Sequence, residues 1–496
     1  FTTQTATREL TALRAGLYGS GPFGRLTDCF PAGLISNAEP GVQVLRDEAL
    51  RTALDALFPT APPADFDAVS HLVLGTIEVP YLLADDDGHG PVVPDAAVVG
   101  ASCDPAEAND WLRVLPVEGD DDEHFRLDSE TGALTAIRAE VPFWCAVPKN
   151  GQPAPVVLYG HDVGGSRLDG LRLAGAWARW GLATCAIDAV GHGPVLSAET
   201  TAALAALDER GRVFELGRAR DLNGDGVLDP GVDTFTPDPL HTRDVIRQSA
   251  LDWVAFLRVL RSFDGRRRWR SRPVGVSSNL AGDFDDDGRV DFGGPDLPVH
   301  VTGEGYGGML AGIVAAIEPR VTSAAPVSAA GGLVDVSLRS ARPGVPQTAL
   351  LPSFGPLIIG LPDVDRRGQT GTGGVLVTAW VNDLARPAHA DPQARVGLPL
   401  AKIATLDPGD LVVLTNLNTG ERREARVNAA GGFQVAVGAE ALMGSARLHR
   451  LRYGPQVDVT ELGDLLRLEV YTDPKVTLET FRYTVNFQEA VYPNQP

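Results

Sequence analysis

Two short acidic segments have the residue types and the spacing that bind a hard cation. In each segment side-chain oxygens stand at loop positions 1, 3, 5 and 9, and glycine stands at position 6. Alternate ligands converge when such a loop winds around Ca²⁺, the glycine permits the sharp turn, and the backbone carbonyl at position 7 adds a ligand. The expected ligands are Asp221, Asn223, Asp225, Val227 and Asp229 in the first loop, and Asp283, Asp285, Asp287, Arg289 and Asp291 in the second.

Both loops resemble EF-hand or dockerin-type calcium loops, but neither has the glutamate that closes an EF-hand loop at position 12. Asp233 and Asp296 stand one and two residues beyond that position and are the candidate closing ligands. The alternative interpretation is that both segments are ordinary solvated turns of an acidic protein. The repetition of one spacing in two segments favours calcium binding over this alternative. We expect two structural Ca²⁺ ions, since no histidine cluster accompanies the carboxylates.

A second pattern is a strand-to-helix turn that lacks its chemical group. Residues 299–308 read Val-His-Val-Thr-Gly-Glu-Gly-Tyr-Gly-Gly. A G-x-S-x-G turn between an apolar strand and an apolar helix presents a serine nucleophile, but Gly305 stands at the serine position. Residues 298–302 have the length of a short buried strand, and apolar residues after the turn recur at helical spacing. Glycine carries no nucleophile, so the turn indicates a fold and withdraws its usual activity.

The elements that would position this turn alternate between strand and helix. Apolar runs at 154–160 and 183–188 predict buried strands, and 171–180 predicts the helix between them. Residues 243–263 predict a long amphipathic helix, and 321–328 predict another buried strand. This order is typical of the α/β class with a doubly wound, mostly parallel sheet.

Three motifs in this order resemble the α/β-hydrolase superfamily of esterases, lipases and acyl-peptide hydrolases. The run His161-Asp162-Val163-Gly164-Gly165 resembles the family's oxyanion loop, residues 188–193 resemble the D-x-x-G-H-G end of the next strand, and the turn at Gly305 comes third. The resemblance covers residues 140–335. It implies an oxyanion hole made by the backbone N–H groups of Tyr306 and of Val163 or its neighbour Asp162, with His161 beside it.

The sequence departs from the family at the groups that do the chemistry. Asp162 replaces a glycine and brings a carboxylate to a site meant for negative charge. The family supplies an acid and a histidine after the turn, but only His389 and His449 follow Gly305, in segments that read as another domain. No catalytic triad can be assembled, so the chain as written is predicted to be inactive. In a complete form it would be a serine hydrolase acting on small acyl esters.

After about residue 340 the pattern changes to short alternating strands at the spacing of a β-sandwich. We expect a mixed α/β N-terminal region over 1–139, an α/β-hydrolase-like core with both calcium loops over 140–340, a linker over 341–369, and an inserted or appended β-sandwich module over 370–496. The family places two further strands after the one at 321–328, so a C-terminal polypeptide that completes the sheet is an expected partner. The strands expected in the module are 376–381, 411–415, 424–427, 433–437, 447–452, 465–471 and 480–487.

Composition bounds the environment and the partners. The 496 residues carry a formal net charge of −21, which argues against nucleic acid and anionic membranes as partners, and no apolar run reaches membrane-spanning length. Of the four cysteines, Cys185 lies in a predicted strand and is expected to be a buried free thiol; Cys29 with Cys103 is the favoured disulfide, and Cys103 with Cys145 the alternative. Few cysteines and few lysines favour a secreted bacterial protein, extracellular or at the cell surface.

Two functions follow from these patterns. The first is a secreted bacterial α/β-hydrolase-fold protein of the esterase or lipase type that lacks its nucleophile. The second is a non-catalytic, calcium-stabilised surface or extracellular binding protein on the same scaffold.

Overall fold

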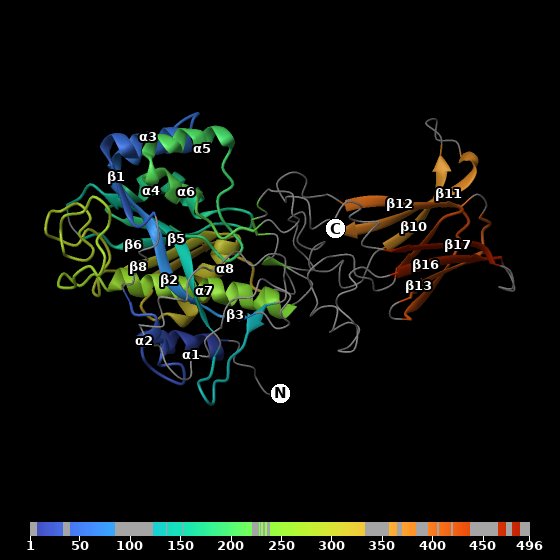
Figure 1. The fold of residues 1–496 in the computed structure, drawn as a ribbon, viewed down its shortest axis with the longest axis horizontal. Helices are drawn as coiled ribbons and strands as arrows, with labels where there is room; N and C mark the ends of the chain where they lie inside the picture. Colours follow the sequence, from blue (N-terminus) through green and yellow to red (C-terminus); the bar gives the residue numbers. More distant parts are fainter. Residues whose placement is uncertain are drawn as a thin grey trace. The chain divides into compact units, whose positions relative to one another are not determined.

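The computed structural model forms two compact units, one made mainly of residues before 334 and one made mainly of Val334–Pro496 (Figure 1). The N-terminal region up to Glu118 belongs to the same unit as the predicted core. The structure describes residues 7–32, 40–84, 123–134, 136–151, 153–220, 228, 230–231, 234–235, 239–332, 357–364, 370–382, 395–403, 406–417, 420–436, 465–472 and 479–486.

A seven-stranded mixed sheet forms the centre of the first unit, in the order β1-β2-β5-β7-β6-β8-β9. The three pairings among β7, β6, β8 and β9 are parallel, and the three that join β1, β2, β5 and β7 are antiparallel. The parallel half is the predicted one; the expectation of a mostly parallel sheet is wrong for the other half, where β2 and β5 form a long antiparallel ribbon. The strands are β1 (Gln43–Arg46), β2 (Val69–Tyr81), β5 (Ile137–Pro148), β6 (Val156–Gly160), β7 (Ala183–Ile187), β8 (Val299–Glu304) and β9 (Ser323–Val327), and β3 (Leu83–Ala84) pairs separately with β4 (His124–Phe125).

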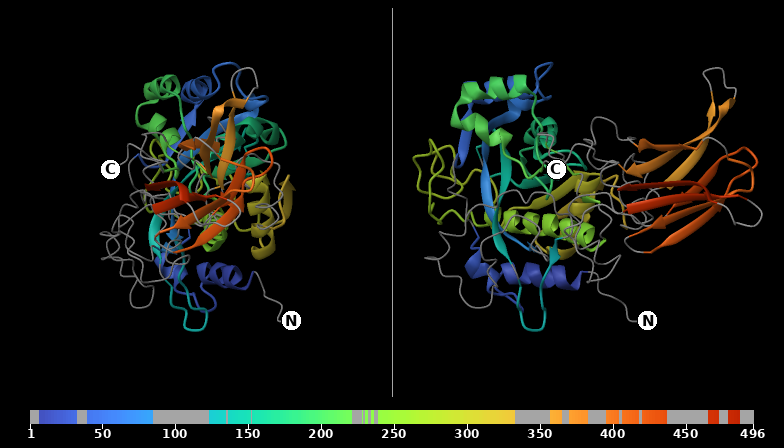
Figure 2. Two further views of the ribbon diagram at one scale, coloured as in Figure 1. Left: turned by 90° about the vertical axis from the view of Figure 1, so that its right-hand side faces the viewer. Right: turned by 45° about the vertical axis from the view of Figure 1, so that its right-hand side comes forward.

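Helices cover both faces of this sheet because successive strand residues point to opposite sides (Figure 2). On β5, Phe143 and Cys145 belong to one apolar core, whereas Trp144 and Ala146 belong to the other. The first core contains α1 (Arg8–Leu17), α2 (Leu26–Cys29), α7 (Pro239–Arg261) and α8 (Tyr306–Ile317); the second contains α3 (Asp47–Leu57), α4 (Leu171–Ala178), α5 (Ala198–Leu204) and α6 (Glu209–Glu215). Short 3₁₀ turns lie at Phe66–Ala68, Arg167–Gly170 and Ala205–Leu207.

Helix α7 is predicted as an amphipathic helix, and the structure contains the helix but buries it on all sides over most of its length. Every residue from 244 to 260 is buried. The two carboxylates in this stretch are paired: Asp252 lies 2.7 Å from the Arg218 guanidinium, and Asp244 lies 2.8 Å from that of Arg247. Arg258 instead donates to the carbonyl oxygen of Phe30 and to Thr27 Oγ1. Polar residues between 244 and 260 therefore mark internal ion pairs and hydrogen bonds instead of a solvent face.

Strand β9 differs from its prediction in the opposite sense. It was expected to be buried, but all five of its residues are exposed. It pairs with β8 on one side and is the last strand in the order of this sheet over the residues that the structure describes. Small side chains of Ser323, Ala324 and Ala325 explain why the apolar run alone was misleading.

The second unit contains two antiparallel sheets of four strands, in the orders β12-β11-β10-β15 and β14-β13-β16-β17. Six of the seven strands predicted here fall on observed strands, and the seventh, 447–452, lies outside the described residues. The strands are β10 (Leu357–Val364), β11 (Thr370–Asn382), β12 (Arg395–Ile403), β13 (Leu411–Asn416), β14 (Arg422–Arg426), β15 (Phe433–Ala436), β16 (Leu465–Tyr471) and β17 (Glu479–Asn486).

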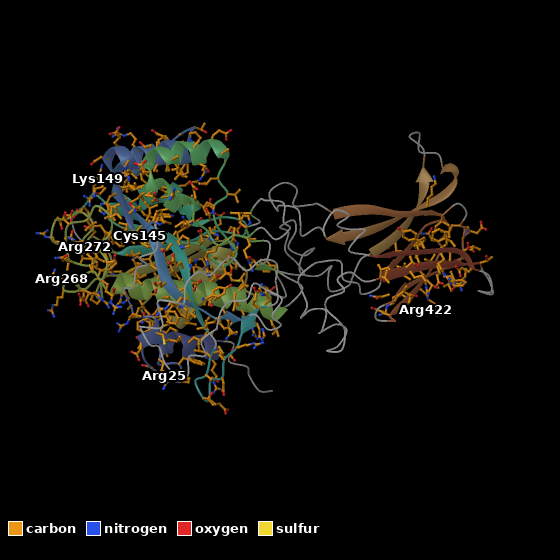
Figure 3. All side chains as sticks on the ribbon, viewed as in Figure 1. Arg25, Cys145, Lys149, Arg268, Arg272 and Arg422 are labelled. Atoms are coloured by element: carbon orange, nitrogen blue, oxygen red, sulfur yellow. A yellow bond between two sulfur atoms is a disulfide. The ribbon has the colours of Figure 1, made fainter. Side chains whose placement is uncertain are left out.

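Basic side chains are spread over separate elements, with Arg25 beside α2, Lys149 after β5, and Arg268 and Arg272 in the loop after α7 (Figure 3). In the part of the chain that the structure describes, no helix combines the length and the apolar character needed to cross a bilayer.

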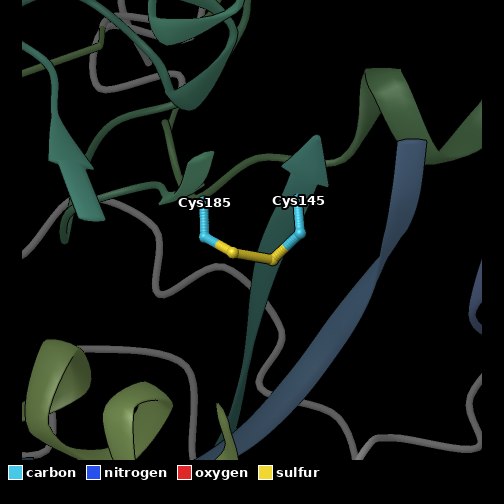
Figure 4. Close-up of a disulfide and its surroundings, with 2 residues drawn as sticks. All are labelled: Cys145 and Cys185. Carbon is cyan, nitrogen blue, oxygen red and sulfur yellow. A yellow bond between two sulfur atoms is a disulfide. The ribbon is translucent and has the colours of Figure 1, made fainter. Parts of the chain in front are cut away.

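A disulfide joins Cys145 on β5 to Cys185 on β7, where the two residues are direct partners in the antiparallel register (Figure 4). The prediction that Cys185 is a free thiol is therefore wrong, because side-chain direction in two adjacent strands brings the cysteines face to face. Cys29 is also disulfide-bonded, and its expected partner Cys103 lies outside the described residues.

Removal of this disulfide should destabilise the first unit strongly. The bond closes a loop with a sequence separation of 40, and cross-links of such length stabilise proteins by about 2–4 kcal/mol. A Cys145→Ala/Cys185→Ala variant should unfold at a clearly lower urea concentration than the wild-type chain. A non-reducing peptide digest is the control: recovery of the Cys145 and Cys185 peptides as separate species would contradict the linkage.

Candidate functional site

The turn between β8 and α8 is tight because chain segments meet there without side chains. Gly305 has φ +54° and ψ −109°, a conformation that residues with a Cβ rarely adopt. A Cβ on Gly307 would lie 2.1 Å from the carbonyl oxygen of Gly160, so the first turn of α8 packs directly on the end of β6. Gly305 thus lies at the carboxyl end of the parallel strands, as the sequence pattern predicts.

The carboxylate of Asp162 lies where a side chain at position 305 would begin. A Cβ on Gly305 would be 2.1 Å from Asp162 Oδ1 and 2.4 Å from its Cγ. The same Oδ1 accepts hydrogen bonds from the backbone N–H of Val163, at 2.8 Å, and of Tyr306, at 3.0 Å. These are the two N–H groups that the resemblance assigns to an oxyanion hole. Both donors are engaged by a carboxylate of the chain itself.

His161 is held by the backbone on both sides of its ring. Its Nε2 accepts the N–H of Ala189 at 3.1 Å, so its Nδ1 carries the proton and donates to the carbonyl oxygen of Asp162 at 2.9 Å. The ring is buried, and this pair of bonds defines a neutral tautomer. His161 therefore orients the loop that carries Asp162 and has no nitrogen available to act as a base.

Polar groups beneath the turn support Tyr306. Its ring stacks on His192 with centroids 5.4 Å apart, and its hydroxyl donates to Ser249 Oγ at 3.3 Å. Ser249 Oγ also accepts the N–H of Val190 at 3.1 Å and donates to the carbonyl oxygen of Val245 at 2.9 Å. Ser249 is fully buried, so it is a packing hydroxyl and not a displaced nucleophile.

A buried ion pair fixes the loop that follows β7 at the same edge of the sheet. Asp188, at the end of β7, pairs with the Arg167 guanidinium and accepts the Arg167 N–H at 2.6 Å. The same guanidinium donates to the carbonyl oxygens of Leu216 and Val213, at 2.6 and 2.7 Å. Such a buried pair is structural, because breaking either partner leaves an uncompensated buried charge.

Negative charge gathers at this edge of the sheet. Burial, together with the carboxylates of Asp169, Glu304 and Asp162, raises the pKa of Tyr159 to about 12. The phenol is therefore neutral at physiological pH. Burial also raises the pKa of Asp252, which the nearby Arg218 guanidinium opposes.

The second predicted calcium loop forms a cluster of four carboxylates that could bind a metal ion. One oxygen from each of Asp283, Asp285, Asp287 and Asp291 lies within 4.8 Å of the others. Asp296 is exposed and does not belong to this group. The spacing 1, 3, 5 and 9 therefore brings together the four side chains that it predicts, and the closing ligand proposed from position alone is not among them.

Backbone amides fix the orientation of these carboxylates. Asp283 accepts the N–H of Gly288 at 3.0 Å through Oδ2, and Asp291 accepts the N–H of Phe284 at 2.7 Å. Asp283 is fully buried, and its Oδ1 has no hydrogen-bond partner in the described part of the chain. A buried carboxylate oxygen without a donor is costly, and a cation would remove that cost.

Two further observations describe the electrostatic environment of the aspartate cluster. Partial burial raises the pKa of Asp285, and the carboxylates of Asp291 and Asp287 add to this rise. His71 Nε2 lies 3.6 Å from Asp291 Oδ2. His71 was not predicted, because it lies on β2, far from the loop in sequence, and only the fold brings it near.

The remaining candidate residues lie outside the described part of the chain. They include the first calcium loop, with Asp221, Asn223, Asp225, Val227, Asp229 and Asp233, and the two histidines after the turn, His389 and His449. The carbonyl of Arg289 lies within the second loop, where the Arg289 N–H donates to Asp287 at 2.8 Å.

No family model matches the sequence, and no curated protein matches it. Among solved structures, the chain is similar to a cold-adapted esterase from an Arctic intertidal metagenomic library, with 18% identity over 43% of this chain and 61% of that chain and a TM-score of 0.21. It is also similar to an acetyl xylan esterase from Paenibacillus sp. R4 (18% identity, 62% and 64% of the two chains, TM-score 0.21) and to acetyl xylan esterase 1 from Thermoanaerobacterium sp. JW/SL YS485 (12%, 59% and 62%, TM-score 0.21). The chain spans less than two thirds of the length of each of these structures, all of which are esterases.

A serine at position 305 should be poorly tolerated while Asp162 is present. The backbone strain of a non-glycine residue there costs about 1–3 kcal/mol, and the overlap with the Asp162 carboxylate adds to it. We expect Gly305→Ser to lower the free energy of unfolding by about 2 kcal/mol or more in urea denaturation, and the cost to fall by about 1 kcal/mol in an Asp162→Gly background.

Gly312 provides the matched control, because it lies on the same helix α8 and a Cβ there would meet nothing within 4 Å. Gly312→Ser should therefore be close to neutral. Equal costs for Gly305→Ser and Gly312→Ser, or no coupling between Gly305→Ser and Asp162→Gly, would contradict the placement of the Asp162 carboxylate.

Proposed function

We propose that this protein is a bacterial α/β-hydrolase-fold protein of the esterase or lipase type that does not hydrolyse esters through a serine. The observation that carries the proposal is the occupied turn: Gly305 offers no nucleophile, and Asp162 takes the space of the missing side chain together with both N–H donors. The parallel strands β7, β6, β8 and β9, with the glycine turn at their carboxyl end, support the hydrolase-like scaffold.

The alternative function is a non-catalytic binding or structural protein on the same scaffold, stabilised by calcium at the cell surface or outside the cell. It is favoured by the aspartate cluster, which lies far from the turn in the fold. Asp291 is joined by backbone hydrogen bonding to Ala154, just before β6 begins, whereas Gly305 lies beyond the opposite end of the parallel strand β8. An ion held there stabilises the loop and does not reach the turn.

Ca²⁺ is the ion we propose for the second loop, because its donors are hard oxygen ligands at the spacing of an EF-hand loop. We extend the same proposal to the first loop on its sequence spacing. The ion would be held by Asp283, Asp285, Asp287 and Asp291, and it would offset the mutual repulsion of these carboxylates.

Three further features belong to the same proposal. A polypeptide strand from a C-terminal segment would complete the sheet at β9, whose exposed residues make that edge accessible.

The two four-stranded sheets of the second unit would pack as a β-sandwich. Secretion is supported by the disulfide between Cys145 and Cys185, since such bonds persist in oxidising compartments.

The wild-type chain should show no turnover of short-chain chromogenic esters, because glycine cannot form an acyl-enzyme. A fluorophosphonate that labels activated serines should also leave it unmodified. Heat-denatured protein provides the background rate, and an active esterase the positive control. Ester hydrolysis that is blocked by labelling of another residue would overturn the proposal, and mass spectrometry of the labelled peptide would identify that residue.

Removal of calcium should destabilise the first unit. A ligand present at a hundredfold excess over its dissociation constant stabilises the folded state by about 2.7 kcal/mol. Chelation should therefore lower the free energy of unfolding by about this amount, which is measured as a lower midpoint in urea denaturation. Asp283→Asn should abolish this calcium dependence at the second loop, whereas Asp296→Asn should retain it because Asp296 lies outside the cluster. Identical midpoints with calcium and with chelator in the wild-type chain would count against both loops.

A further inference from the structure

Arginines gather in one short segment of the first unit, although basic side chains elsewhere are spread over separate elements. Between α7 and β8, residues 266–272 read Arg-Arg-Arg-Trp-Arg-Ser-Arg, and we call residues 266–281 the arginine hairpin. Four of its five arginines are exposed, namely Arg266, Arg268, Arg270 and Arg272. None of the five guanidinium groups forms an ion pair with a carboxylate in the part of the chain that the structure describes. The hairpin therefore concentrates exposed positive charge on a chain whose formal net charge is −21.

Backbone hydrogen bonds and an aromatic contact fix the shape of the arginine hairpin. The N–H of Trp269 donates to the carbonyl oxygen of Asn279 at 3.0 Å, and the N–H of Ala281 donates to that of Arg267 at 2.9 Å. The Trp269 ring packs against Phe284, with centroids 5.2 Å apart. A ligand would therefore order the arginine side chains but not the loop itself, which lowers the entropic cost of binding.

The carboxylates beside the hairpin are engaged by other groups. Asp264 Oδ1 accepts the first two backbone N–H groups of the hairpin, at 2.8 and 2.7 Å. Asp286 Oδ1 accepts the N–H groups of Ser277 and Ser278, at 2.8 and 2.7 Å. The other four aspartates of the acidic loop converge on one another. The exposed guanidinium groups of the hairpin are therefore open to an external anion.

An exposed tryptophan lies at the same edge of the sheet. This edge carries the carboxyl end of β5 and the amino ends of β6, β7 and β8. Trp180 stands shortly before β7 and is 83% exposed. The acidic loop that packs on the hairpin reaches the edge just before β6, where the N–H of Ala154 donates to the carbonyl oxygen of Asp291 at 2.9 Å. Lys149 directly follows β5, and Figure 3 shows it on the same side of the first unit as the labelled arginines of the hairpin.

Guanidinium groups and an exposed indole together fit a sugar chain that carries acidic groups. The planar guanidinium fork pairs with a carboxylate or a sulfate through two hydrogen bonds. The indole face offers apolar surface on which the C–H face of a sugar ring can pack. We infer that this edge of the sheet binds a linear acidic polysaccharide, with the hairpin arginines on its carboxylate or sulfate groups and Trp180 against one of its sugar rings.

The distribution of charge favours a narrow ligand over a broad one. Positive charge is concentrated in one short segment of an acidic protein, so a membrane or a nucleic-acid duplex that extends beyond the hairpin would meet negative charge. A single sugar chain can contact the hairpin and Trp180 alone. The inference rests on the proposed extracellular location, where such chains are encountered. It does not rest on the lack of ester hydrolysis, because Gly305 lies at the opposite end of the parallel strands.

Calorimetry of oligosaccharide binding to the full chain tests this surface, at constant ionic strength and with calcium present. The acidic probes are a hexagalacturonate, which carries carboxylates, and a sulfated hexasaccharide of glucose. Uncharged maltohexaose is the control ligand. The wild-type chain should bind at least one acidic probe and should not bind maltohexaose. The probe that binds identifies the carboxylate or the sulfate as the recognised group.

Replacement of three hairpin arginines by glutamine should weaken this binding at least about tenfold, because three exposed charge pairs are lost. The positions are Arg266, Arg268 and Arg270. The matched control removes three exposed arginines of β14 in the second unit and should leave the affinity unchanged; its positions are Arg422, Arg423 and Arg426. Trp180→Ala should weaken binding and remove most of the change in tryptophan fluorescence that the acidic sugar produces in the wild-type chain.

Three results would overturn the inference. The first is that neither acidic probe binds the wild-type chain. The second is an equal loss of affinity in the hairpin variant and the β14 variant. The third is tighter binding of a single-stranded oligonucleotide, or of vesicles that contain anionic phospholipid, than of either sugar. None of these measurements depends on ester hydrolysis, so they can fail while the proposed lack of activity stands, and the reverse.

Discussion

The contact of the Asp162 carboxylate with two backbone amides is the interaction around which the sheet edge is organised. It joins the loop after β6 to the N-terminus of α8 through one oxygen atom. The approach is possible because Gly305 and Gly307 place no Cβ between these segments. A carboxylate at a helix N-terminus is favoured by the dipole and by the unsatisfied amides. The glycine at position 305 and the carboxylate at position 162 are thus two parts of one local arrangement, since the carboxylate occupies the space that a side chain at 305 would need.

Much of this edge could be predicted from the sequence because its signals are local. Glycine spacing around Gly305, the apolar periodicity of the following helix and the glycine-rich loop after residue 160 each depend on neighbours within a few residues. The four aspartates of the second acidic loop converge for the same reason. The sequence also identified Asp162 as a departure from the oxyanion-loop pattern that this segment resembles. It could not place the carboxylate on both amides, because that placement depends on the path of two segments more than 140 residues apart.

The failures of sequence reasoning share a physical cause, which is dependence on tertiary contacts. Helix α7 has charges at several turns and reads as amphipathic, yet its carboxylates and guanidinium groups find one another or distant partners inside the protein. Strand β9 is apolar enough to be buried, but its residues are exposed among the parts of the chain that the structure describes. Pairing of Cys145 with Cys185 depends on strand register, which spacing along the chain does not reveal. His71 reaches the aspartate cluster only through the sheet.

The position of the Cys145–Cys185 bond has a kinetic consequence. Both cysteines are completely inaccessible to solvent, between two strands and under the core formed with α7. Thiol–disulfide exchange requires a thiolate to approach a sulfur atom, so a reductant can attack only after this part of the sheet opens. When the opened sheet closes faster than the reductant attacks, the rate of disulfide reduction in the native protein is proportional to the equilibrium constant for opening. The bond therefore reports how often this part of the core opens. A small reductant added to the folded chain would therefore measure the sheet's internal stability without any denaturant.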